Sequence, residues 1–267
     1  MELERKRRLS VDWSKAGLGI FALVYLMVLS NPAFAEPYLA GYGGGVSPLN
    51  EGIRFKTYFD GGEVENLTLE DVPFEGGIVF GIKLGDYFEG TGTRGNLGLE
   101  MEFSHFDLDL EGQTVGASGA FVNSTVTTRE IRASELTVNS LGLNVLYRLH
   151  LAGGERFPRG RLQPYFGVGL GLFFASLESG PTFLDQASVL KDTGSDSQLG
   201  LQAMAGARFF LTTHLAFFGE YKFVQTRDFD FHLSNSGTVS GTPVTEATEW
   251  EFPVRVHQLY GGIAYHF

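Results

Sequence analysis

Apolar side chains alternating with polar or small ones, with a period of two, are the feature that most restricts how this chain can fold. After residue 35 the alternation recurs in eight segments, which are separated by clusters of Gly, Ser, Thr, Asn and Asp. This period places successive side chains on opposite faces of a β-strand. We therefore predict eight strands, over residues 37–47, 76–87, 96–110, 135–150, 162–178, 198–212, 215–232 and 252–267.

The two faces of the predicted strands differ in a way that indicates which one meets lipid. In residues 77–85 one face carries the large apolar side chains of Ile78, Phe80, Ile82 and Leu84, and the other carries glycines, Val79 and Lys83. A soluble sheet buries its apolar face and would not line its core with Gly, Arg and Glu. We expect the apolar face to point outward into hydrocarbon, and the glycine-rich face to line the interior of a barrel.

The connections between the predicted strands alternate in length. Long ones span residues 48–75, 111–134, 179–197 and 233–251, and short ones span 88–95, 151–161 and 213–214. Short periplasmic turns and long extracellular loops are typical of transmembrane antiparallel up-and-down β-barrels. The sequence predicts an all-β barrel of about eight strands with both termini on the periplasmic side. Apolar stretches at 53–59 and 121–131 leave open either ten strands or hairpins that extend beyond the membrane.

The N-terminus has the pattern of a secretory signal peptide. Arg5, Lys6, Arg7, Arg8 and Lys15 precede the apolar run 17–29, and the small residues of Ala33-Phe34-Ala35 follow it. An apolar run of this length is short for a spanning helix, which needs about 20 residues. We predict a cleaved signal peptide over residues 1–35 and a single barrel domain over residues 36–267.

Composition and charge exclude several functional classes. The chain has 36 Gly, 24 Phe and 10 Tyr but only 19% charged residues, which suits a barrel with a crowded interior and aromatic girdles. It carries 20 basic and 31 acidic residues; residues 1–35 hold five and three of them, which leaves 15 and 28 and a net charge of −13. This acidity disfavours nucleic acid as a partner. Cysteine is absent and the histidines lack metal-ligand spacing, so we expect no cofactor and no metal.

Seven charged residues share the predicted inward face, and isolated charges there would be costly. We expect them to form a lumen ion-pair network that fills the barrel, because an eight-stranded interior is only just wide enough for side chains. A narrow diffusion pore is the alternative. The seven residues are Lys83, Glu100, Glu102, Arg148, Arg208, Glu220 and Lys222.

The second half of the chain resembles a known family. The stretches 163–169, 206–211 and 218–223 and the ending 260–267 are similar to the outer-membrane protein β-barrel family, whose small eight-stranded members include the OmpA membrane domain and OmpX. The last alternate residues, Tyr265 and Phe267, resemble the assembly signal of such barrels. The resemblance implies the bacterial outer membrane as location. It also implies outer-membrane lipids, lipopolysaccharide and the barrel-assembly machinery as partners.

The sequence favours a structural or surface-interaction role, in envelope integrity, adhesion or recognition, with a surface ligand bound through the four long loops. One motif offers an enzymatic alternative. His232-Leu233-Ser234-Asn235, followed by Glu246, resembles the motif of the lipid A deacylases. That resemblance implies Ser234 as nucleophile, His232 as base and Glu246 as orienting acid. Against it, the phase of strand 215–232 predicts that His232 and Ser234 face inward, away from the acyl chains.

Overall fold

The computed structural model describes residues 35–59, 62–88, 95–121, 124–131, 133–179, 192–239 and 242–267. Residues 36–267 form one compact unit. In the described part of the chain, no helix has the length and apolar character needed to cross a membrane. The predicted signal peptide, apart from Ala35, lies outside the described residues and stays a prediction.

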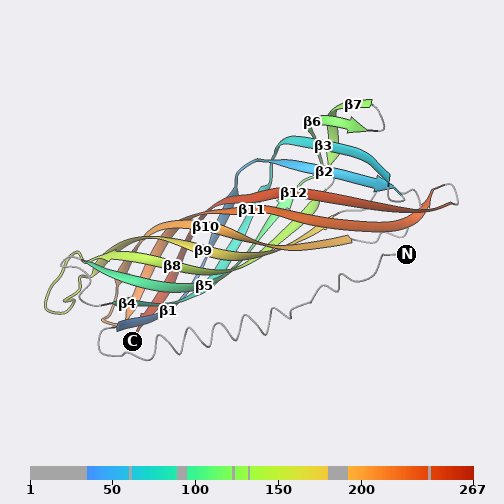
Figure 1. Ribbon diagram of the computed structural model, residues 1–267. Coiled ribbons are helices and arrows are strands. Elements are labelled where there is room, and N and C mark those ends of the chain that lie inside the picture. The colour runs from blue at the N-terminus through green and yellow to red at the C-terminus, as the bar shows by residue number, and fades with distance from the viewer. Residues whose placement is uncertain are drawn as a thin grey trace. The chain divides into compact units, whose positions relative to one another are not determined.

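Eight strands form a closed ring (Figure 1). They follow the order β1-β4-β5-β8-β9-β10-β11-β12, and pairing of β12 with β1, from Tyr38 opposite His266 to Pro48 opposite Val256, closes it. The predicted eight-stranded barrel is therefore confirmed. The bounds of the ring strands are β1 Ala35–Pro48, β4 Glu75–Phe88, β5 Gly95–Leu110, β8 Ser134–Leu149, β9 Leu162–Ser179, β10 Asp192–Phe210, β11 Leu215–Val239 and β12 Thr242–His266.

Four further strands lie within the first two long connections. These are β2 (Glu51–Phe59), β3 (Gly62–Val72), β6 (Gln113–Phe121) and β7 (Ser124–Ile131). They extend the sheet from the far half of β12 in the order β2-β3-β6-β7 and do not enter the ring. The two apolar stretches that left the strand number open thus belong to hairpins beside the ring. We call this end of the barrel the hairpin end, and the opposite end, where Glu36 and Phe267 lie, the terminal end.

The outward face of the ring changes from apolar to polar along each strand. Near the terminal end it exposes a band of large apolar side chains, such as Val168, Leu201 and Leu259, which are 65%, 63% and 70% exposed. Further along β10 the outward positions are Ser197 and Ser195. Strands β11 and β12 have 25 residues each, whereas 9–11 residues suffice to cross a membrane. The strands therefore continue well beyond the apolar band.

The inward face changes in the opposite sense. At the level of the band the interior holds buried charges, including Lys83 and Glu100. Beyond the band it is apolar, with Phe106, Leu108 and Phe231 almost fully buried. The interior of the hairpin half therefore differs from the lining of glycine and paired ions that we expected for the barrel. There the outer face is in water, so apolar side chains are buried inside as in a soluble protein.

Glycines on the inward face make room for large rings. A β-carbon at position 85 would lie 2.5 Å from the Tyr38 hydroxyl oxygen, and one at position 171 would lie 2.5 Å from the ring of Phe173. Only glycine leaves these volumes to the aromatic side chains. The abundance of both Gly and aromatic residues in the sequence thus has one steric cause.

A β-bulge in β11 reverses the orientation of its outer half. The register with β12 shifts between Gln225 and Asp228, and an extra residue in one strand moves the following side chains to the other face. Phe231 and Leu233 consequently point inward, and His232 and Ser234 are exposed on the outer face. The predicted inward orientation of His232 and Ser234 was therefore wrong, because uninterrupted alternation was assumed.

The same substitution should cost much more within the apolar band than beyond it, on the same outer face of β10. We expect Leu201→Arg to lower the free energy of unfolding in lipid vesicles by about 2–4 kcal/mol, because it places a charge in hydrocarbon. Ser195→Arg, which lies beyond the band, should change it by no more than about 1 kcal/mol. Urea titration of the folded fraction measures both. Equal effects would show that Leu201 does not face lipid.

Candidate functional site

The interior at the level of the apolar band contains six buried charges, which we call the ion cluster. Lys83 is at its centre: Nζ lies 2.7 Å and 2.9 Å from the two carboxylate oxygens of Glu220, and 3.1 Å from Oε1 of Glu100. Lys222 forms an ion pair with Glu102. Arg208 Nη2 lies 3.8 Å from Glu100 Oε2. Three cations thus face three anions, and the cluster is neutral as a whole.

Hydrogen bonds from neutral side chains complete the cluster. The hydroxyl of Tyr38 donates to Glu100 at 2.5 Å, and that of Tyr165 donates to Glu220 at 2.7 Å. Tyr42 and Tyr260 donate to Glu102 and Glu220 respectively. The amide of Asn144 bridges Glu100 and Glu102 at 3.0 Å and 3.3 Å. Each carboxylate therefore has both cations and neutral donors as partners, as buried charges require.

Strand register brings these residues together. Lys83 on β4 lies opposite Glu102 on β5, and Met204 on β10 lies opposite Lys222 on β11. The side chains then meet across the ring, which links Lys83 of β4 to Glu220 of β11. Within the band, the apolar face of each strand points outward to lipid. A charged side chain at this level therefore has to point into the interior of the barrel.

Arg148 lies apart from the other six residues of the predicted network. Its guanidinium forms two hydrogen bonds with Glu36 at the terminal end, at 2.7 Å and 3.1 Å, and a third with Gln163 at 3.1 Å. The ring of Tyr87 lies 3.9 Å from the guanidinium carbon. The interior charges thus form two groups, one within the band and one at the mouth of the barrel.

Several residues of these groups were missed by reasoning from the sequence, although the same alternation could have found them. Glu36, Tyr38 and Tyr42 share a face of β1, and Tyr260 and His266 share a face of β12; all five are buried. Tyr265 and Phe267 are 48% and 68% exposed, and their role as an assembly signal stays a prediction.

His232 and Ser234 of the deacylase motif lie on the outer face beyond the band. Nδ1 of His232 is 3.4 Å from Asp230, and Nε2 is 3.5 Å from Glu249. The backbone of Glu246 lies opposite Asn235, three residues away from His232 along β11; its side chain lies outside the described residues. Among the described side chains, Glu249 is a downstream carboxylate that contacts the histidine.

Within the described ranges, no three His, Asp and Glu side chains gather as metal ligands.

The ion cluster already satisfies its carboxylates with cations and hydroxyls. Its arrangement therefore suits a permanent structural role within the barrel better than turnover of a substrate.

Removing one partner of the ion cluster should destabilise the barrel strongly. We expect Lys83→Met to lower the free energy of unfolding by about 3–5 kcal/mol, because Glu220 and Glu100 keep buried charge without their cation. The double variant Lys83→Met/Glu220→Gln should lose less than the sum of the single variants. Urea titration in lipid vesicles measures the free energy of unfolding of the wild type, the two single variants and the double variant. Arg54→Gln, which removes the two exposed ion pairs of Arg54 with Asp228 and Glu251, is the control and should cost about 1 kcal/mol or less. Additivity of the two single losses would contradict the pairing.

Comparison with known proteins gives a family match over most of the chain. The family described as outer membrane protein beta-barrel domain matches residues 21–267. No curated protein matches the sequence.

Crystal structures of small outer-membrane barrels are also similar to this chain. Neisserial surface protein A is 12% identical, over 87% of this chain and 99% of its own, with a TM-score of 0.43. OprG from Pseudomonas aeruginosa is 16% identical over 88% and 97%, with a TM-score of 0.41. The outer membrane protease OmpT from Escherichia coli is 10% identical over 87% and 97%, also at 0.41. We infer no activity from similarities at this level.

Proposed function

This chain belongs to the outer membrane protein β-barrel family, and on that premise we propose that it presents its hairpin end to the medium as a recognition or adhesion surface. Its location is the bacterial outer membrane. The observation that carries the proposal is the reversal of polarity along the strands: beyond the apolar band, the same strands continue as a sheet with a charged outer face and an apolar inner face.

The outer face at the hairpin end is polar and carries its charges in contact with one another. Arg54 of β2 forms ion pairs with Asp228 of β11, at 2.9 Å, and with Glu251 of β12. These three side chains are 41–55% exposed. Contacts across three strands hold the face in one arrangement, and a preorganised polar surface suits recognition of a partner.

The inner face at the hairpin end supports this surface from below. Phe55 of β2 packs edge-on against Trp250 of β12, with ring centroids 5.1 Å apart, and Phe231 packs against Phe252 at 5.4 Å. A sheet supported in this way is rigid far from the membrane. The ion cluster and this apolar core together fill the interior, which supports a scaffold rather than the diffusion pore considered from the sequence.

The test of the proposed function is attachment of intact cells. We expect cells that lack the chain to attach less to host-cell monolayers or solid surfaces than wild-type cells. The wild-type chain should restore attachment. The outer-face variant Arg54→Gln/Asp228→Asn/Glu251→Gln should restore it only in part, because the ion pairs between these three side chains are gone. Attachment that is equal with and without the chain would contradict the proposal.

Two controls make this experiment specific. Glu155→Gln changes an exposed charge at the terminal end and should attach like wild type. The chain has no cysteine, so a membrane-impermeant maleimide can verify that each variant is displayed. Thr68→Cys, exposed on β3, should react on intact cells, and Leu69→Cys, buried on the inner face, should not.

A second candidate function is ester hydrolysis on lipid A. One specific observation favours it: the β-bulge turns His232 and Ser234 to the outside of the barrel, beyond the apolar band, and Nε2 of His232 lies 3.5 Å from Glu249. In this version of the hypothesis Ser234 is the nucleophile and His232 the base, and Glu249 replaces Glu246 as the orienting acid.

The lipid A profile of cells decides between the two candidates. As a recognition surface, the chain should leave the mass spectrum of lipid A unchanged when it is expressed. As a hydrolase, it should remove one acyl chain, and Ser234→Ala should abolish this change while Ser195→Ala, on the outer face of β10, should not. Glu249→Gln and Glu246→Gln then identify the orienting acid.

A further inference from the structure

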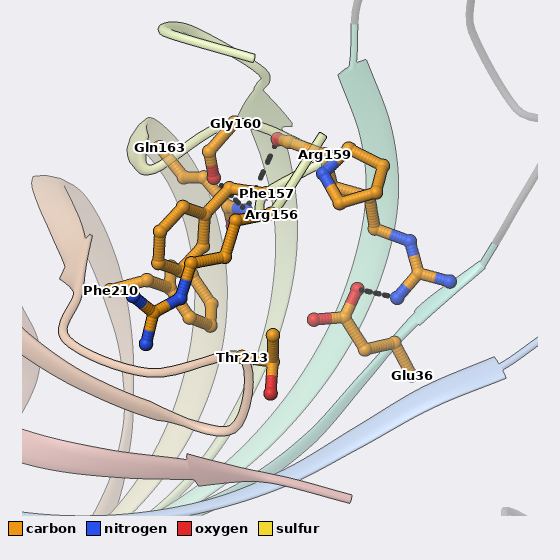
Figure 2. Close-up of a pocket in the computed structure, with 9 residues that line it drawn as sticks. Glu36, Arg156, Phe157, Arg159, Gly160, Gln163, Phe210 and Thr213 are labelled. Atoms are coloured by element: carbon orange, nitrogen blue, oxygen red, sulfur yellow. Dashed lines mark hydrogen bonds and ion pairs between the residues drawn. The ribbon is translucent and has the colours of Figure 1, made fainter. Parts of the chain in front are cut away.

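A cavity of about 260 Å³ lies at the terminal end of the barrel (Figure 2). Three parts of the chain form its walls: the start of β1 with Glu36, the turn between β8 and β9 with Arg156, Phe157 and Arg159, and the end of β10 with Phe210. Figure 2 shows the two arginines and the two phenylalanine rings around this space. Neither the ion cluster nor the outer face of the hairpin end contributes to it.

The floor of the cavity is a built polar structure. Glu36 is held by both Nη atoms of Arg148 and by Arg159 Nη1, which is 3.0 Å from Glu36 Oε2. Gln163, only 2% exposed, donates to the carbonyl oxygens of Arg159 and Gly160 at 3.2 Å and 3.0 Å. The turn that carries the two arginines is therefore anchored to the barrel, and the cavity is preformed.

Arg156 is a cation of the lining that the floor does not use. The floor pairs Glu36 with Arg148 and Arg159, and Nδ1 of His266 lies 2.7 Å from Glu36 Oε1. The guanidinium of Arg156 lies 5.7 Å from the Phe157 ring, and no carboxylate of the described residues contacts it.

We propose that this cavity binds a small anion, a carboxylate or a phosphate, that is attached to an apolar or planar group. Arg156 supplies the planar donors that carboxylates and phosphates prefer, and the rings of Phe157 and Phe210 contact the attached group. The cavity is smaller than the 300–1,000 Å³ typical of sites for whole drug-sized ligands. It therefore takes the end of a larger molecule.

The position of the cavity limits the source of this anion. The terminal end, with its short turns, is the periplasmic end of such a barrel. Two periplasmic molecules present the required chemistry: peptides of the cell wall, which end in a free carboxylate, and phospholipids of the inner leaflet, which present a phosphate. Binding of a wall peptide would tie the barrel to the cell wall beneath it, and binding of a phospholipid would tie it to its own membrane.

The test is calorimetric titration of the purified protein in a non-ionic detergent with three probes: N-acetylalanine, its neutral amide and inorganic phosphate. We expect saturable binding of at least one anion and none of the amide. Arg156→Ala should weaken binding about tenfold or more, because hydrogen bonds to charged groups are worth that much. Arg227→Ala removes an exposed arginine of β11 that does not line the cavity, and should bind like wild type.

The outcomes are distinguishable. Preference for N-acetylalanine identifies a peptide terminus as the source, and preference for phosphate identifies a lipid headgroup. Failure of both anions to bind, equal binding of the amide, or the same loss in Arg227→Ala would overturn the proposal. Arg156 is exposed and makes none of the contacts of the floor, so its substitution should leave the fold intact. Unchanged heat-dependent gel mobility of the barrel verifies this.

Discussion

Hydrocarbon offers no hydrogen-bond partners, and most features of this structure depend on that constraint. A strand within it must pair on both edges, so the sheet closes through β1 and β12. The side chains around the closed ring must then be apolar outside, which leaves the interior as the only place for charge. Beyond the membrane, water removes the constraint, and the same strands return to an apolar inside and a polar outside. The polarity of the fold thus reverses where lipid gives way to water.

The ion cluster follows from the narrowness of the ring. Eight strands enclose too little space for bulk water, so Lys83, Glu100, Glu220 and their partners can be charged only if they neutralise one another. Tyrosine hydroxyls satisfy the remaining lone pairs, and inward glycines make room for the tyrosine rings. Charge balance, hydroxyl donors and glycine positions therefore form one interdependent arrangement, and a change in one of them affects the others.

The two ends of the barrel support different proposals on the same scaffold. The hairpin end gains area because β2, β3, β6 and β7 extend the sheet from β12. The terminal end has short turns, and its distinctive feature is a cavity lined by Arg156 and Arg159 in a chain that is acidic as a whole. A charged outer sheet and an arginine-lined inner mouth would let one barrel engage a partner on each side of the membrane.

The sequence by itself determined the ring: the number of its strands, their outward faces and the inward charges follow from a period of two, because alternation is a local property of each strand. The phase of β11 beyond Gln225 could not be predicted, because a β-bulge adds one residue without changing the composition. The sequence also did not predict that Arg148 is separate from the ion cluster, that β2 pairs with β12, or that a cavity lies at the mouth. Each depends on which residues meet across the ring, and only the closed tertiary structure sets that register.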